Sequence, residues 1–95
     1  MQNIKYKRIL DCLCNYYRIT EYEYANELKE KDNRYLLLLL LKNCNCLDIK
    51  EVKKLLELRD SRSIINNINR AEEKLLMNKI FRENYFELED IIINK

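Results

Sequence analysis

Apolar residues between positions 48 and 75 repeat at helical spacing, with one interruption near position 58. Those before the interruption share one face of a short helix that Asp48 can cap: Ile49, Val52, Leu55 and Leu56. Those after it fall at offsets of four, seven and eleven: Ile64, Ile68, Ala71 and Leu75. The pattern predicts two helices joined by a tight turn.

The polar side of the second helix carries side chains suited to DNA. Its outward residues follow Asp60, the expected cap: Arg62, Ser63, Asn66, Asn67 and Arg70. Arg, Ser and Asn side chains read base edges and hold phosphates. Lys50, Lys53 and Lys54, on the outer side of the first helix, could hold the flanking DNA backbone, whereas we expect Arg59 to brace the turn through an ion pair. This is the layout of a DNA-binding helix-turn-helix.

Helical patterns also cover the rest of the chain. We expect helices over about 3–17, from Thr20, over the leucine-rich stretch, and from about 81 or 84 to 93. Thr20 and Glu23 form a capping-box pattern, Asn33 is a good cap for the leucine-rich helix, and Asn78 is expected to end the fifth helix in a left-handed conformation. The side chains expected to face inward near the two ends of the chain are Ile4, Ile9, Leu13, Tyr17 (or Tyr16), Phe86, Ile91 and Leu88.

Composition excludes most other fold classes. The chain of 95 residues contains no Gly and no Pro, which tight hairpins and bulges require. With 47% apolar residues it can bury a modest core without metals or disulfides. We therefore expect an all-α fold, a single domain over residues 1–95 with a bundle of about six helices, and no cofactor or small-molecule substrate.

The run of six leucines from Leu36 to Leu41 is far too short to cross a membrane, and Arg34 and Lys42 flank it. A buried central helix is the better interpretation. No stretch has the pattern of a signal peptide, so we expect a cytoplasmic protein without a membrane partner.

Four cysteines form two pairs, Cys12/Cys14 and Cys44/Cys46. Structural zinc pairs usually leave two to four residues between ligands, and side chains two residues apart on a helix point about 200° apart. A zinc site is thus the less favoured interpretation, and without a secretory signal a disulfide framework is disfavoured too. We expect Cys12, Cys44 and Cys46 to act as small buried apolar residues.

The net charge of +2 is too small to indicate a nucleic-acid binder, so the distribution of charge matters more. Residues 1–18 carry four basic and one acidic side chain, and residues 34–62 carry seven and four. Residues 19–33 and 63–95 carry more acidic than basic side chains. The positive excess therefore lies at the start of the chain and across the expected DNA-binding segment, although a solvated charged surface with no partner is the ordinary alternative.

Several short stretches recur at the intervals of a known family: Tyr16-Tyr17-Arg18-Ile19, Arg34 and Lys42 around an apolar helix, Leu47-Asp48-Ile49-Lys50-Glu51-Val52, Arg59-Asp60, Ile64-Ile65, Glu72-Glu73 and Phe81-Arg82. On these residues, from Ile9 to the last helix, the chain resembles the DNA-binding C-terminal domain (domain IV) of the bacterial replication initiator DnaA. That domain is a helical bundle with a Trp repressor-like helix-turn-helix. The family's most specific stretch is Gly-Gly-Arg-Asp-His-Ser/Thr-Thr-Val, which here reads Glu57-Leu58-Arg59-Asp60-Ser61-Arg62-Ser63-Ile64. Because Glu57 and Leu58 replace the family's two glycines, the resemblance implies that one of them takes the left-handed conformation that glycine usually adopts, or that the turn is reshaped.

The resemblance implies roles for individual residues. Asp60, Ser61 and Arg62 would contact bases in the major groove. Four further residues would contact phosphates: Ser63, Asn66, Arg34 and Lys42. The Arg-rich loop that enters the minor groove in the family is shortened here to residues 29–32. No Gly-rich phosphate loop occurs, so we expect no ATPase part.

The favoured hypothesis is a double-stranded DNA-binding module, sequence-specific or not, that acts as a regulator of replication or transcription or as an accessory of a mobile element. The alternative is a degenerate helix-turn-helix domain that binds another protein, or a second copy of itself, through four tyrosines of the first two helices: Tyr16, Tyr17, Tyr22 and Tyr24. An enzyme is not expected, because the chain has no His and no Ser or Cys with an evident activating partner.

Overall fold

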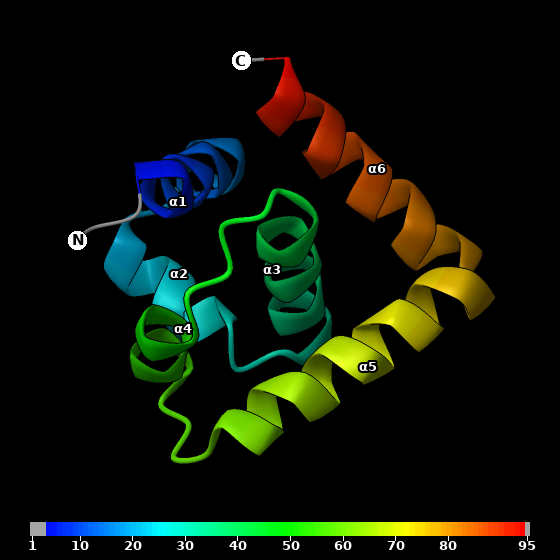
Figure 1. The fold of residues 1–95 in the computed structure, drawn as a ribbon. Coiled ribbons are helices and arrows are strands. Elements are labelled where there is room, and N and C mark those ends of the chain that lie inside the picture. The colour runs from blue at the N-terminus through cyan, green and yellow to red at the C-terminus, as the bar shows by residue number, and fades with distance from the viewer. Residues whose placement is uncertain (1–3, 95) are drawn as a thin grey trace.

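The computed structural model describes residues 4–94, and its regular structure over this range is helical throughout. Six helices follow one another along the chain (Figure 1). They are α1 (Ile4–Tyr17), α2 (Glu21–Glu27), α3 (Lys31–Asn43), α4 (Ile49–Leu56), α5 (Ser61–Met77) and α6 (Lys79–Ile93). The expectation of a small all-α bundle of about six helices is confirmed. None of the described helices is both long and apolar enough to span a bilayer.

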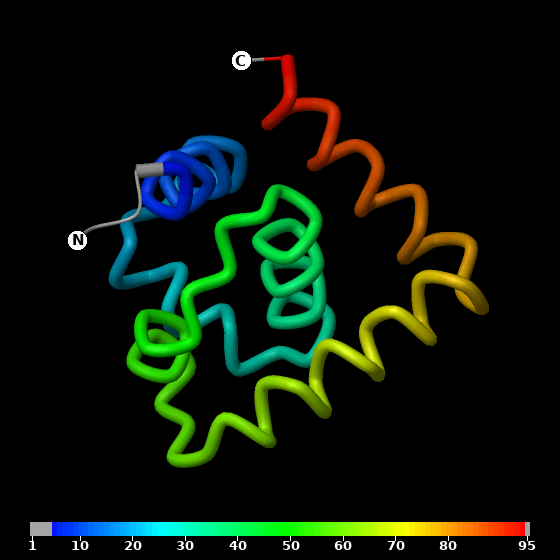
Figure 2. The backbone as a smooth tube through the Cα atoms, viewed as in Figure 1, coloured from blue at the N-terminus to red at the C-terminus, as the bar shows by residue number. Residues whose placement is uncertain are grey.

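The leucine-rich helix α3 lies at the centre, and α1, α5 and α6 each contact it (Figures 1 and 2). Its side chains from Leu37 to Leu41 are at most 1% exposed. Neighbouring helices surround α3, so this part of the helix is buried on every side. A helix buried in this way can be apolar all round, without a polar face. The interpretation of a buried central helix is confirmed.

Helices α4 and α5 form the predicted pair, and residues 57–60 connect them. Val52 of α4 and Ile64 and Ala71 of α5 are fully buried, and Ile68 is 7% exposed. The helical spacing of these apolar residues therefore orients both helices toward the core. The polar side of α5 is left to face away from it.

Three helices end on a residue that carries a β-carbon in the left-handed region: Arg18 (φ 58°), Asn45 (φ 56°) and Glu57 (φ 55°). In each case the next residue donates its N–H to a carbonyl five positions earlier, at 3.0 Å: Ile19 to Cys14, Cys46 to Leu41 and Leu58 to Lys53. These are Schellman ends, and each following residue is apolar and packs against the core, as that motif favours. Of the two residues expected to be left-handed at the end of α4, Glu57 adopts this conformation and Leu58 does not.

Two expected caps are wrong. Helix α3 begins at Lys31 rather than after Asn33, and the Asn33 amide instead donates to the Glu27 carbonyl at 3.0 Å, tying α3 to the end of α2. Asn78 is extended (φ −115°, ψ 112°) rather than left-handed. Its side-chain oxygen accepts from the Phe81 N–H at 2.9 Å, so Asn78 caps the start of α6, which begins earlier than expected.

Several expected inward positions at the chain ends are also wrong. Phe86 is 52% exposed, and Tyr16 and Tyr17 are 41% and 37% exposed. Helix α6 instead buries Phe81, Tyr85 and Leu88, because its start at Lys79 and its contacts with α5 and α3 rotate that face inward. Ile9, Leu13 and Leu88 are buried as expected, Ile91 is half-buried, and the side chain of Ile4 lies outside the described part.

All four cysteines are free thiols; Cys12, Cys14 and Cys46 are buried and Cys44 is half-buried. Burial raises the pKa of the thiols of Cys14, Cys44 and Cys46. These residues therefore behave as small apolar side chains, as expected for Cys12, Cys44 and Cys46.

Candidate nucleic-acid interface

The start of α5 is a surface-exposed helix N-terminus with a side-chain cap. The Asp60 carboxylate accepts from the Arg62 N–H at 2.9 Å, and the Ser63 N–H donates to the Asp60 carbonyl at 3.1 Å. This cap fixes where the helix begins, because it satisfies amide groups that have no partner within the helix. The side chains of Asp60 and Arg62 are exposed, and those of Ser61 and Ser63 are half-buried.

Arg62 and Asn66 lie one turn apart on the same exposed side of α5. Both have the donors that recognise bases or phosphates, and the buried residues Ile64 and Ile68 lie on other sides of the helix. Asn67, predicted to point away from the core, is half-buried, and its amide donates to the Ser63 carbonyl at 2.7 Å. Because Asn67 is not free, the exposed polar surface of α5 is narrower than the sequence predicted.

Helix α4, which precedes the start of α5 in the chain, carries three lysines. Asp48 caps α4 through the N–H groups of Lys50 (3.0 Å) and Glu51 (3.3 Å). Lys50 and Lys54 are exposed, whereas Lys53 is half-buried. A shallow groove of about 320 Å³ between α1 and α4 is lined by Tyr6, Lys7, Leu10, Glu21, Glu51, Lys54 and Leu55. Lys54 therefore lies near both a second lysine and two carboxylates.

Arg34, expected at a phosphate, is already engaged within the fold. Its guanidinium donates to the carbonyls of Leu28 (3.2 Å) and Lys29 (2.7 Å), which closes the C-terminal end of α2. It also lines a groove of about 390 Å³ between α2 and the α4–α5 turn, together with Lys29, Leu58 and Asn67. The structure thus brings Arg34 beside the turn while giving it a bracing role.

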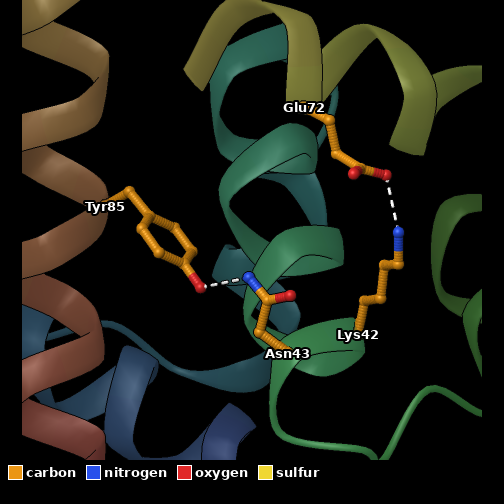
Figure 3. Close-up of polar contacts among 4 residues, drawn as sticks. All are labelled: Lys42, Asn43, Glu72 and Tyr85. Carbon is orange, nitrogen blue, oxygen red and sulfur yellow. Dashed lines mark hydrogen bonds and ion pairs between the residues drawn. The ribbon is translucent and has the colours of Figure 1, made fainter. Parts of the chain in front are cut away.

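Lys42, the other expected phosphate ligand of α3, pairs with Glu72 of α5 at 2.6 Å (Figure 3). Both side chains are nearly half exposed. Glu72 lies 11 residues after Ser61, which is roughly 16 Å along the helix. The structure therefore does not bring Lys42 together with the start of α5, and a phosphate would have to compete with the Glu72 carboxylate. The neighbouring Asn43 amide donates to the Tyr85 hydroxyl at 2.6 Å and ties α3 to α6 (Figure 3).

The expected ion pair of Arg59 is wrong: within residues 4–94 its exposed side chain has no such partner. Two other interactions stabilise the turn instead. The Leu58 N–H donates to the Lys53 carbonyl, and the Leu58 side chain packs against the core. Arg59 is therefore an additional free cation beside the start of α5. From the sequence alone, Arg59 was expected to form an ion pair at the turn, so it was not counted among the cations available to DNA.

The candidate interface has a modest positive charge rather than a strongly basic one. Over residues 50–66, the exposed cations are Lys50, Lys54, Arg59 and Arg62, and the exposed carboxylates are Glu57 and Asp60. A mixed surface of this kind supports a few phosphate contacts, and its affinity for DNA should depend on salt. Among the described residues, no group of three potential metal ligands exists that could hold a metal ion.

The chain matches no family model, and it is similar to no curated protein and to no solved structure.

Proposed function

We propose that this chain is a double-stranded DNA-binding module that inserts the start of α5 into the major groove. The observation that carries the proposal is the exposed, capped and polar N-terminus of a 17-residue helix whose opposite side is anchored in the core. An α-helix fits the width of the major groove, and its first turn reads the base edges. Regulation of replication or transcription, or service to a mobile element, is the biological setting we propose for it.

The side chains divide into two roles. Arg62 reads a base, because arginine can donate two bonds to guanine, and the hydroxyl of the preceding Ser61 contacts a base as well. Ser63, half-buried at the first turn, and the exposed Asn66 contact phosphates, which the positive end of the α5 dipole favours. Lys50, Lys53, Lys54 and Arg59 hold the flanking backbone.

Asp60 acts first as the cap of α5, since one carboxylate oxygen accepts from Arg62 N. Its other oxygen can accept from the amino group of a cytosine, which is the usual base partner of a carboxylate. Arg34 and Lys42 contribute less than the resemblance implies, because each already has a partner in the fold.

Fluorescence anisotropy against labelled duplexes of mixed sequence tests the proposal. We expect binding at low ionic strength that weakens as salt is added, with a slope that reports a few phosphate contacts. Arg62→Ala should lower affinity by about 10-fold or more if Arg62 is bidentate on guanine, and should relax preference at one base pair.

Arg70→Ala is the matched control, because it removes the same group from the same helix two turns further on. We expect it to change affinity by less than about 3-fold, as for the loss of one peripheral phosphate contact. Absence of salt-dependent binding by the unmodified chain would contradict the proposed function. Equal losses in the two variants would show that Arg62 contacts the DNA backbone and not a base.

A further inference from the structure

The corner between α5 and α6 exposes three large apolar side chains within five consecutive positions of the chain. Leu76 is 77% exposed, Met77 79% and Ile80 71%. Figure 2 shows this corner at the edge of the molecule, at the opposite end of α5 from its connection to α4. Single apolar residues on a surface need no explanation, but a contiguous group indicates an interaction site.

Side-chain hydrogen bonds to the backbone hold the two helices together at this corner. The Arg82 guanidinium donates to the carbonyls of Leu75 (2.9 Å) and Leu76 (2.6 Å), which satisfies the end of α5. Asn78 caps α6 directly afterwards. Lys74 lies over the Phe81 ring, 5.3 Å from its centroid, on the core side of the same corner.

Charges of both signs surround the apolar group. Glu73, Lys79 and Glu83 are exposed, and within the described chain none of them has an ion-pair partner. A rim with both a cation and carboxylates is complementary to itself when it meets a copy related by a two-fold axis. A purely acidic or purely basic rim would instead repel its own copy.

We propose that the surface formed by Leu76, Met77 and Ile80 packs against the same surface of a second copy of this chain. The apolar side chains meet at the two-fold axis, and Lys79 of each copy faces Glu73 or Glu83 of the other. Methionine suits such a contact because its flexible side chain adapts to an irregular partner surface.

The size of the surface sets the expected strength. In each copy, burying these three side chains removes on the order of 300 Å² of apolar area from water. This area is well below the roughly 800 Å² that each partner buries in a standard stable interface. The dimer should therefore be reversible, with a Kd in the micromolar range or weaker.

One consequence rests on the proposed DNA-binding function. Helix α5, of 17 residues, is about 25 Å long, and the dimer surface and the candidate reading end lie at its opposite ends. A two-fold dimer at this surface would hold the two reading ends apart, as DNA-binding dimers that contact two half-sites do. A palindromic DNA site would then be favoured, because its symmetry matches that of the dimer.

Sedimentation equilibrium of the protein alone, from about 10 μM to about 1 mM, tests the dimer without DNA. We expect a reversible monomer–dimer equilibrium for the unmodified chain and a Kd at least about 10-fold higher for Met77→Glu, which places a charge at the two-fold axis. Ile93→Glu is the matched control, because Ile93 is 68% exposed at the far end of α6 and should not change the Kd. Circular dichroism should show that both variants keep the helical content of the parent chain.

A charge reversal gives a second, independent measurement. Lys79→Glu should weaken the dimer, and combining it with Glu83→Lys and Glu73→Lys should restore it, because the pairing across the axis is then inverted. Ala25→Arg, in the groove beside α2, should leave it unchanged. A strictly monomeric chain, a dimer insensitive to Met77→Glu, or one broken by Ala25→Arg would overturn the proposal. Each result is independent of whether the protein binds DNA.

Discussion

Three residues other than glycine in the left-handed backbone conformation are the clearest local feature of the described chain. Arg18, Asn45 and Glu57 each keep a β-carbon in a conformation that disfavours it, at φ between 55° and 58°. The Schellman bonds and the apolar residue after each of them compensate for this strain. Stability should therefore increase wherever the β-carbon is removed from such a residue.

Glu57→Gly tests this at the turn before α5. We expect the free energy of unfolding to rise by about 0.5–1 kcal/mol, because relief of the left-handed strain exceeds the entropy that glycine adds to the unfolded chain. Chemical denaturation measures the change. Glu57→Ala is the control: it removes the same charge but keeps a β-carbon, so it should not stabilise. Equal effects of the two substitutions would mean that the carboxylate, and not the backbone, sets the cost.

Among the helices, α3 contributes most to the core because neighbours surround it. Its leucines pack against α1, α5 and α6 at once, whereas Leu76 near the end of α5 is 77% exposed. The same residue type should therefore differ greatly in its effect on stability between these two helices.

Leu38→Ala and Leu76→Ala make a matched comparison, at 0% and 77% exposure. The first should lower the free energy of unfolding by about 3–5 kcal/mol, since it leaves a cavity in the centre of the core. The second should change it by less than about 0.5 kcal/mol at protein concentrations where the chain is monomeric. Urea denaturation at low concentration measures both. A small loss for Leu38→Ala would contradict the central position of α3.

Buried phenols and thiols make the stability of the whole molecule depend on alkaline pH. Burial raises the pKa of Tyr6 from 10.0 to about 12 and raises the pKa values of Tyr24 and Tyr85, for which burial is also the main cause. Burial likewise raises the pKa of the thiols of Cys14 and Cys46 above 9.0. A group whose pKa is higher in the folded state binds its proton more tightly there, so unfolding becomes easier once the unfolded group can ionise.

We therefore expect the contribution of these groups to stability to be fully present below about pH 9 and to decrease as the pH rises toward 12. Thermal unfolding followed by circular dichroism between pH 7 and pH 11, under reducing conditions, measures this. Tyr6→Phe, which keeps the ring but cannot ionise, should make the alkaline decrease shallower. A melting temperature that stays constant to pH 11 would contradict the expectation.

Some elements of this fold were predictable from local signals. The apolar spacing of residues 48–75 predicted α4 and α5 and their inward residues, and the Thr20–Glu23 capping box is present as expected. Asn78 shows the limit of such reasoning, because asparagine suits both a left-handed helix end and a helix cap. The choice between them depends on where α6 must pack. Phe86 was misplaced for the same reason, since the start of α6 determines which of its sides faces α3 and α5.

The sequence by itself determined that the chain is helical, where most helices lie and which side chains of α4 and α5 face the core, because these follow from the spacing of apolar residues along one segment. Only the tertiary structure decided which polar side chains are free. Lys42 meets Glu72, Arg34 closes α2, and Arg59 has no ion-pair partner among the described residues. Partners of this kind come from other elements, so no spacing within one segment predicts them. The same reason hides the exposed corner of Leu76 and Met77, whose apolar character resembles that of core residues until the packing shows that nothing in the described chain covers it.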